Sequence, residues 1–295
     1  MSLLLSALAT AIAFSAYTAV GALGFSLQYA TTNMLNLAYG DLMIIAGYLT
    51  YTIHNRGVNF FWSAALGVLG TCVLSYVFSR WLLIPAVRRN MSQAALILVT
   101  LGVSIVVEAV INMIWGAGSV SFGLPAAPFL QAGGFSWTSE DFASVACAVV
   151  LLGGSYVLLE KTKLGRSMRA IASDKDLALT CGIAADRIMT ISWVISGLLC
   201  GIAGVLLSAE TVSFNAVTGF TFTVVIVAAA FVGGIGQMGG AVLGAIVVGF
   251  VSQFAAAYSD PAYVDVFAFG LLAAVLLIRP TGIISDVASK RELVV

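Results

Sequence analysis

Long apolar runs alternate with short polar intervals along the whole chain. Most of these runs approach or exceed the roughly 20 residues that an α-helix needs to cross a membrane. The pattern therefore predicts an all-α fold: a polytopic transmembrane helical bundle of about eight or nine spans, with residues 1–295 in a single domain. The predicted spans cover residues 3–27, 31–54, 60–83, 94–114, 142–159, 188–208 and 262–278, together with two apolar halves within 211–257.

Two of these stretches do not read as simple helices. Residues 31–54 are interrupted by Asn33, Asn36, Gly40 and Asp41, and the region around 211–235 is the second such stretch. Irregular backbone is tolerated at membrane depth only where it is buried in protein or lines a cavity. We therefore expect one or two broken or re-entrant segments, which leaves the number of crossings at eight or nine.

The placement of charge predicts the orientation. Only 9 % of the residues are charged, against 61 % that are hydrophobic, and the basic residues concentrate in Arg80–Arg89, Lys161–Arg187 and Arg279–Arg291. Because loops rich in Lys and Arg stay in the cytoplasm, these intervals and the C-terminus of this multi-pass chain are predicted to be cytoplasmic. The outer side would then hold residues 54–59, 116–141 and 259–261.

Residues 160–187 form the one long polar interval, and six basic residues lie in it. Within it, Ser173 and Asp176 have the spacing of a capping box, which predicts a short helix over residues 176–181. Gly182 would end that helix in the left-handed conformation. Such a helix is suited to docking into a partner's groove. The alternative is a basic loop that only orients the protein, and the residues alone favour neither.

One predicted span carries a polar stripe. Thr100, Ser104, Glu108 and Asn112 follow one another at intervals of four, so a helix would place them on one face. A carboxylate in the middle of a span costs about 2.5–3.5 kcal/mol, so Glu108 should face the protein interior or water. The stripe either holds two helices together by hydrogen bonds, which we favour, or belongs to a substrate or proton site.

A second polar candidate lies at the interruption of residues 31–54 and comprises Asn36, Tyr39, Gly40 and Asp41. Gly40 would permit a break in the helix. The freed backbone groups and Asn36 could then coordinate a polar solute, as broken helices do in transporters. The alternative is a turn at the membrane boundary in which Asp41 caps the start of a helix.

Several absences limit the chemistry. The sequence has no G-x-x-x-x-G-K-[ST] motif, so ATP hydrolysis is not expected on this chain. His54 is the single histidine, and no Ser/His/Asp set suited to hydrolysis can be assembled. We expect no catalytic residue, no metal site, no cofactor and no nucleic-acid partner. Small residues at intervals of four instead predict a helix-packing seam at Ser192, Ser196, Cys200, Gly204 and Ser208.

Four motifs, spread between about residues 20 and 286, together resemble those of branched-chain amino acid ABC transporter permeases. The first motif resembles the cytoplasmic loop of that family. It consists of Thr162-Lys163-Leu164-Gly165-Arg166, then Arg169-Ala170, and then Asp176-x-Ala178-x-x-x-Gly182. The others are the first broken segment (Asn36-Leu37-Ala38-Tyr39-Gly40-Asp41), a glycine motif (Gly233-Gly234-Ile235-Gly236) and a closing motif (Arg279-Pro280-Thr281-Gly282-Ile283).

The resemblance implies a permease subunit of an ABC importer, embedded in the lipid of a bacterial-type cytoplasmic (inner) membrane. It also implies two ATP-binding subunits, a second permease subunit that is identical or related, and an extracytoplasmic solute-binding protein. The chain departs from the family at Tyr39, where members commonly have a histidine, and near Val225, where they often have a lysine. The expected solute is therefore a branched-chain or other amino acid, or else urea, an amide or an organic acid.

Site residues follow from the polar candidates and the resemblance together. Substrate-pathway residues are predicted to be Asn36, Tyr39, Gly40, Asp41, Thr100, Ser104, Glu108, Gly233, Gly234 and Gly236. Residues that couple the pathway to an ATPase are predicted to be Arg166, Arg169, Asp176, Ala178 and Gly182. The alternative function is an ion-coupled secondary transporter that uses Glu108 or Asp41 as its ion site, and a passive channel comes third.

Overall fold

The computed structural model describes residues 2–89, 91–123, 128–132, 135–258, 264–278 and 282. The predicted outer turn at 259–261, the basic interval Arg279–Arg291 and all of the closing motif except Gly282 lie outside these residues. The first half contains α1 (Ser2–Thr32), α2 (Tyr39–His54), α3 (Phe60–Phe78), the π-helical turn η1 (Ser79–Leu83), α4 (Ile84–Arg88), α5 (Gln93–Trp115), β1 (Pro128–Ala132) and β2 (Phe135–Thr138). The second half contains α6 (Ser139–Lys161), α7 (Lys163–Ser173), α8 (Lys175–Thr180), α9 (Ala185–Glu210), α10 (Ala216–Gly233), α11 (Met238–Tyr258) and α12 (Val264–Ile278).

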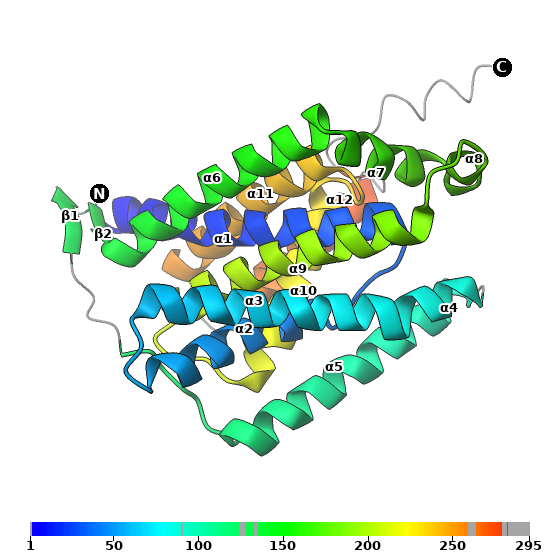
Figure 1. Ribbon diagram of the computed structural model, residues 1–295. Coiled ribbons are helices and arrows are strands. Elements are labelled where there is room, and N and C mark those ends of the chain that lie inside the picture. The colour runs from blue at the N-terminus through cyan, green and yellow to red at the C-terminus, as the bar shows by residue number, and fades with distance from the viewer. Residues whose placement is uncertain are drawn as a thin grey trace.

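The helices form one all-α bundle, as predicted, and the described residues also include a two-stranded hairpin (Figure 1). Seven helical segments among the described residues are long and apolar enough to cross a membrane, with α3 and its continuation through η1 into α4 taken as one. The helices α2 and α12 are shorter, at 16 and 15 residues. Eight or nine crossings were expected from the sequence, and seven candidates of full length are found among the described residues.

Helix α1 is the centre of the bundle. It packs against α11, α9, α6 and α10, while α2 packs between α3, α9 and α10. The main apolar cluster draws on α1, α2, α9, α10 and α11 and includes Phe25, Tyr39 and Ile226. Helix α5 lies at the side of the bundle in Figure 1 and contacts α2 and α10. One face of α5 is therefore buried, and the other carries exposed apolar residues suited to lipid or a partner subunit.

The predicted small-residue seam on α9 is confirmed. Ser192, Ser196, Cys200 and Ser208 are buried, and a Cβ atom at Gly204 would overlap the backbone carbonyl of Met43 in α2. Close approach of two backbones is the usual way in which membrane helices associate, because lipid offers no hydrophobic drive between them. The seam fixes α2 against α9, and so sets the depth at which the broken segment lies.

The structure decides between one and two broken segments and corrects one expectation about a loop. The region 211–235, the second stretch that could have been broken, contains one continuous helix, α10, from Ala216 to Gly233 after a short loop. The outer interval 116–141, expected to be a loop, contains the antiparallel β1–β2 hairpin. Phe135, Ser136, Trp137 and Thr138 alternate apolar and polar side chains as a strand does, and the glycine-rich composition around them hid this short pattern.

Two ends of the bundle can be distinguished. Helices α7 and α8 lie at one end and the hairpin at the other (Figure 1). Gly282, which follows α12, lies against the α10–α11 turn, since a Cβ on Gly282 would be 2.6 Å from Cα of Gly234. Gly282 therefore lies at the end of the bundle that also holds the α10–α11 turn.

Candidate functional site

The chain between α1 and α2 is not helical from Asn33 to Ala38, so the predicted break exists. Asn33 has a φ of 53°, a left-handed value that asparagine adopts more readily than most residues, and it ends α1. The amide nitrogen of Asn36 donates to Oε1 of Gln28 at 3.1 Å, and its Oδ1 accepts from the backbone N–H of Ala38 at 3.1 Å. Asn36 is buried, and it replaces the hydrogen bonds that the missing helical turn would have made.

The polar stripe of α5 packs against this broken segment. Oγ1 of Thr100 accepts from the N–H of Leu37 and lies at the same distance, 3.3 Å, from the carbonyl of Leu35. One turn further on, Ser104 donates to Oδ2 of Asp41 in a short hydrogen bond. The two polar candidates therefore form one seam between α2 and α5, which agrees with the structural role favoured for Thr100 and Ser104. Glu108 is half-buried on the same face.

Asp41 is an incompletely bonded group of this seam, and the buried hydroxyl of Tyr39 is another. The Asp41 side chain is fully buried, and its Oδ1 has no hydrogen-bond partner within the described part of the chain. Asp41 lies in the first turn of α2, but the residue at the N-cap position is Ala38, so the alternative in which Asp41 caps the helix start does not apply. A buried carboxylate oxygen without a partner is costly, and such groups in a membrane protein mark candidate ligand or ion contacts.

The role expected for Gly40 is wrong. The break ends before it, and Gly40 lies inside the first turn of α2. Its N–H donates to Oγ1 of Thr223 in α10 at 2.8 Å, and a Cβ atom would overlap the carbonyl of Gly219. Glycine is needed here because α2 and α10 touch through their backbones, not because the helix bends.

The two positions at which the chain departs from the resembled family are both interior. Tyr39 is 1 % exposed, its ring packs edge-on against Phe25 with centroids 5.6 Å apart, and its carbonyl accepts from the thiol of Cys200 at 3.3 Å. Val225 is buried in the same apolar cluster. Neither side chain lines a described cavity.

The glycine motif builds the turn between α10 and α11. Gly234 ends α10 with a φ of 112°, and Gly236 follows with a φ of 81°, values that favour glycine. A Cβ on Gly233 would overlap the carbonyl of Gly240, so the two helices meet through their backbones at this turn. Of the three glycines, Gly236 lines the large cavity described next.

A cavity of about 880 Å³ opens at the α7–α8 end of the bundle. The end of α1, the α7–α8 segment, the start of α9 and the α10–α11 turn all contribute to its walls. Among the predicted site residues, Arg169 and Gly236 line it, whereas the α2–α5 seam does not. Most of the residues that line this cavity were not predicted from the sequence. The feature that could have indicated them is the polar run at the end of the first span, namely Gln28, Tyr29, Thr31, Thr32 and Asn33.

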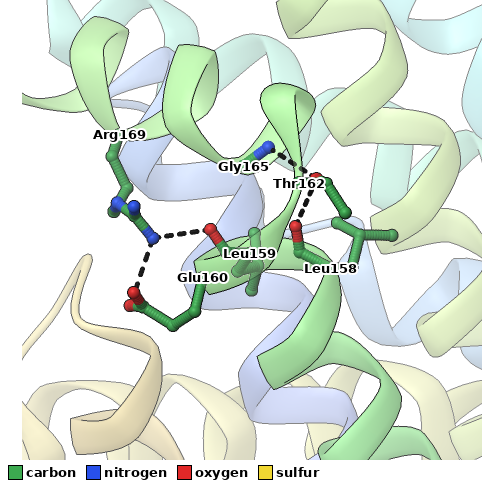
Figure 2. A network of polar contacts seen from close by, with 6 residues as sticks. All are labelled: Leu158, Leu159, Glu160, Thr162, Gly165 and Arg169. Atoms are coloured by element: carbon green, nitrogen blue, oxygen red, sulfur yellow. Dashed lines mark hydrogen bonds and ion pairs between the residues drawn. The ribbon is translucent and has the colours of Figure 1, made fainter.

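Residues of the Thr162–Arg166 motif form the corner between α6 and α7 (Figure 2). The hydroxyl of Thr162 accepts from the N–H of Gly165 at 3.1 Å and donates back to the carbonyl of Leu158, so one side chain closes α6 and begins α7. A Cβ on Gly165 would overlap the carbonyl of Leu159. Arg169 donates to that same carbonyl and pairs with Glu160 at 3.1 Å. These contacts make the corner rigid.

Helix α8 differs from the prediction in its cap. Asp174, not Ser173, is the N-cap: its Oδ1 accepts from the N–H groups of Asp176 and Leu177, both at 2.9 Å. The predicted capping box is therefore wrong, because the adjacent carboxylate reaches the same orphan donors. The predicted end is confirmed, since Gly182 has a φ of 81° just after the helix.

Ala178 faces the protein itself. It is 4 % exposed and belongs to a cluster with Met168, Ile171 and Ile188 from α7 and α9. Ala178 was predicted to couple the pathway to an ATPase, but this burial places it inside the protein and not on a docking surface. The side chains that α8 exposes are Leu177, at 62 %, and Leu179, at 48 %, and Arg166 and Asp176 are exposed as well.

Comparison with known proteins assigns the chain to a family. The profile of the family described as "Branched-chain amino acid transport system / permease component" matches residues 7–276. The permease protein LivH of the high-affinity branched-chain amino acid transport system of Escherichia coli (strain K12) is 30 % identical over 282 residues, 89 % of each chain. A probable branched-chain amino acid transport permease protein LivH of Methanocaldococcus jannaschii is 32 % identical over 288 residues, covering 92 % of this chain and 90 % of that protein.

A solved structure shares the fold. PsaBC from Streptococcus pneumoniae, in complex with Fab, aligns with 93 % of this chain and 92 % of its own, with a TM-score of 0.51 at 12 % identity. The relatives are permease components of ABC transporters and not enzymes, and they do not support the ion-coupled alternative. With a match that runs from residue 7 to residue 276, this chain belongs to the family of branched-chain amino acid transport system permease components.

Proposed function

We propose that this chain, acting as one transmembrane domain, forms the translocation pathway of an ABC importer for a branched-chain or similar apolar amino acid. The observation that carries the proposal is the family match over residues 7–276, on relatives of about the same length. The complete transporter would contain two ATP-binding subunits, a second permease that is identical or related, and an extracytoplasmic solute-binding protein. The absence of a phosphate-binding motif from this chain fits a separate ATPase.

The seam between α2 and α5 is the proposed wall of the pathway. Asp41 supports this, because it holds a buried carboxylate oxygen that the described residues leave unbonded. Asn36, Tyr39 and Gly40 then act as the frame of the seam, and Gly233, Gly234 and Gly236 shape the turn at its inner end. A second subunit placed along α5 would enclose the seam and exclude lipid from it.

The α7–α8 segment is the proposed contact for the ATPase, with Leu177 and Leu179 as its apolar contacts and Arg166 and Asp176 beside them. Both leucines are exposed on a short helix at the end of the bundle. Large apolar side chains that are exposed together on one helix are typical of a surface that binds a partner. Arg169 supports the segment from within, because it ties α7 to the end of α6. ATP-driven closure of the partner would move this rigid corner as a unit, since the partner binds the two conformations differently.

Uptake by the complete transporter in proteoliposomes tests the proposed solute. Labelled leucine should enter only with ATP and the binding protein present, and isoleucine and valine should compete at similar concentrations. Urea, acetamide and short organic acids should compete poorly. The proposal fails if urea or an amide is taken up and the branched-chain amino acids neither enter nor compete.

A further inference from the structure

The cavity of about 880 Å³ at the α7–α8 end has no role in the pathway described so far. Its volume lies in the range of small-molecule sites, about 300–1,000 Å³. The orientation proposed from the basic loops would open it to the cytoplasm. We propose that it is a second binding site, entered from the cytoplasm, for a small zwitterion with an apolar side chain. This inference rests on the solute class proposed above.

One part of the wall is suited to a carboxylate. Arg169 and Lys175 line the cavity, and no Asp or Glu is among the described residues that line it. The charge of Arg169 is partly used, because its guanidinium pairs with Glu160 at 3.1 Å. Lys175, in the first turn of α8, is exposed and is the more available cation. A charge-assisted contact from Lys175 to a carboxylate is among the stronger hydrogen bonds that a protein surface offers.

Another part of the wall is suited to an ammonium group, and it is the end of α1. The hydroxyls of Thr31 and Thr32 donate their single protons to carbonyls one turn earlier: Thr31 at 3.1 Å to Leu27 and Thr32 at 2.7 Å to Gln28. Having donated, each oxygen retains only lone pairs for a ligand, and both residues line the cavity. The last carbonyls of α1 add the partial negative charge of a helix C-terminus.

The remaining wall is apolar. Ile171 of α7, Met189 of α9 and Phe231 and Ile235 near the α10–α11 turn line the cavity. Ile171 and Met189 are almost fully buried, so they form a fixed surface. A ligand that uses all three parts must carry an anion, a cation and an apolar group. A free amino acid with an aliphatic side chain is the smallest common solute that does.

Binding of labelled leucine to the purified chain in lipid nanodiscs tests the site. Leucinamide, which lacks the carboxylate, and 4-methylpentanoate, which lacks the ammonium group, serve as competitors. Leucine should compete at about tenfold lower concentration than either analogue, as expected for one charge-assisted contact at each end. Absence of saturable leucine binding, or equal competition by either analogue, overturns the proposal.

Two variants separate this cavity from the α2–α5 seam. Lys175→Gln should weaken leucine binding about tenfold and leave leucinamide unchanged, and Thr32→Val should weaken leucine binding and leave 4-methylpentanoate unchanged. Lys163→Gln is the matched control, since Lys163 is an exposed basic residue of α7 outside the cavity lining. Equal effects of Lys175→Gln and Lys163→Gln would overturn the site. Uptake by the complete transporter is scored separately, so a failed solute proposal and a failed cavity proposal give different results.

Discussion

At the scale of single residues, most of the predicted pathway side chains already have partners within the chain. Asn36 bonds to Gln28 and to the backbone of Ala38, and Thr100 bonds to the broken segment. Their hydrogen bonds replace those of a missing helical turn. These side chains therefore stabilise the break rather than remain free to bind a solute. Asp41 and Tyr39 differ, because Ser104 satisfies only one of the two oxygens of Asp41, and the buried hydroxyl of Tyr39 has no partner among the described residues.

Removal of the Ser104 hydroxyl should therefore destabilise the protein. Ser104→Ala leaves the buried Asp41 carboxylate without its donor, which we expect to cost about 1–3 kcal/mol of unfolding free energy. Thermal unfolding in detergent measures this as a lower midpoint. Ser167→Ala is the control, because the Ser167 hydroxyl bonds only to the backbone of its own exposed helix. Equal stability of the two variants would show that the Ser104–Asp41 contact is unimportant.

Gly40 makes a second prediction at this scale. Gly40→Ala places a methyl group against the carbonyl of Gly219 and should separate α2 from α10, at a cost of about 1–3 kcal/mol. Gly102→Ala in α5 has open space around the new methyl group and should be neutral or slightly stabilising. Unfolding midpoints and membrane levels of the two variants are compared. If Gly40→Ala were as stable as Gly102→Ala, the backbone contact would be wrong.

At the scale of elements, the α6–α7 corner and α8 behave as one rigid unit. Thr162, Gly165 and Arg169 fix the corner, and Ala178 fixes α8 against α7 and α9. The outward face of α8 is left to Leu177 and Leu179. A partner that binds this face would thus move the whole corner, and this movement would couple the partner ATPase to the membrane helices.

Two kinds of α8 variant should therefore fail differently. Leu177→Ser with Leu179→Ser removes exposed side chains, so the fold should persist while stimulation of the partner ATPase by the binding protein is lost. Ala178→Trp overfills a buried site and should lower the unfolding midpoint as well. ATPase activity and thermal unfolding of the reconstituted transporter separate the two. Normal ATPase stimulation in the double serine variant would contradict a coupling role for α8.

The turn after α8 allows a test of backbone conformation. Gly182→Val must adopt a φ of 81° that valine disfavours, at a cost of about 1–3 kcal/mol. Because a Cβ there would meet nothing within 4 Å, any loss comes from strain and not from a clash. We expect Gly182→Asn, which tolerates positive φ, to retain most of the coupled ATPase activity that Gly182→Val loses. Equal coupled ATPase activities of the two variants would show that coupling does not depend on the backbone conformation of this turn.

At the scale of the whole molecule, the orientation of the bundle can be measured with a natural label. Cys181 is an exposed free thiol beside α8, whereas Cys72 and Cys147 are partly buried and Cys200 is buried. A membrane-impermeant maleimide should label Cys181 in inside-out vesicles and not in right-side-out cells, because basic loops stay in the cytoplasm. Cys181→Ser should abolish that label. Labelling of intact cells at Cys181 would reverse the proposed topology.

The sequence by itself determined the features that depend on neighbours along the chain. Membrane spans follow from local apolar runs, because insertion energy is summed over consecutive residues. The predicted spans lie close to the helices, apart from residues 31–54, where α2 begins only at Tyr39. The break before α2 and the glycine after α8 were also predictable, since each rests on local backbone preferences. Within α8, Ser173 and Asp174 could both cap, and only the folded geometry selected Asp174.

The tertiary structure alone decided the features that depend on which helices become neighbours. Gly40 looked like a breaking residue, but its role was set by α10, more than 170 residues later in the chain. Ala178 looked like a contact for a partner, but α7 and α9 cover it. The joining of Ser104 to Asp41, and the cavity built from four separate segments, likewise have no local signature. Packing between helices depends on complementary surfaces from positions that are far apart in the sequence. The pattern of apolar and polar residues along the chain does not show which helices pack together.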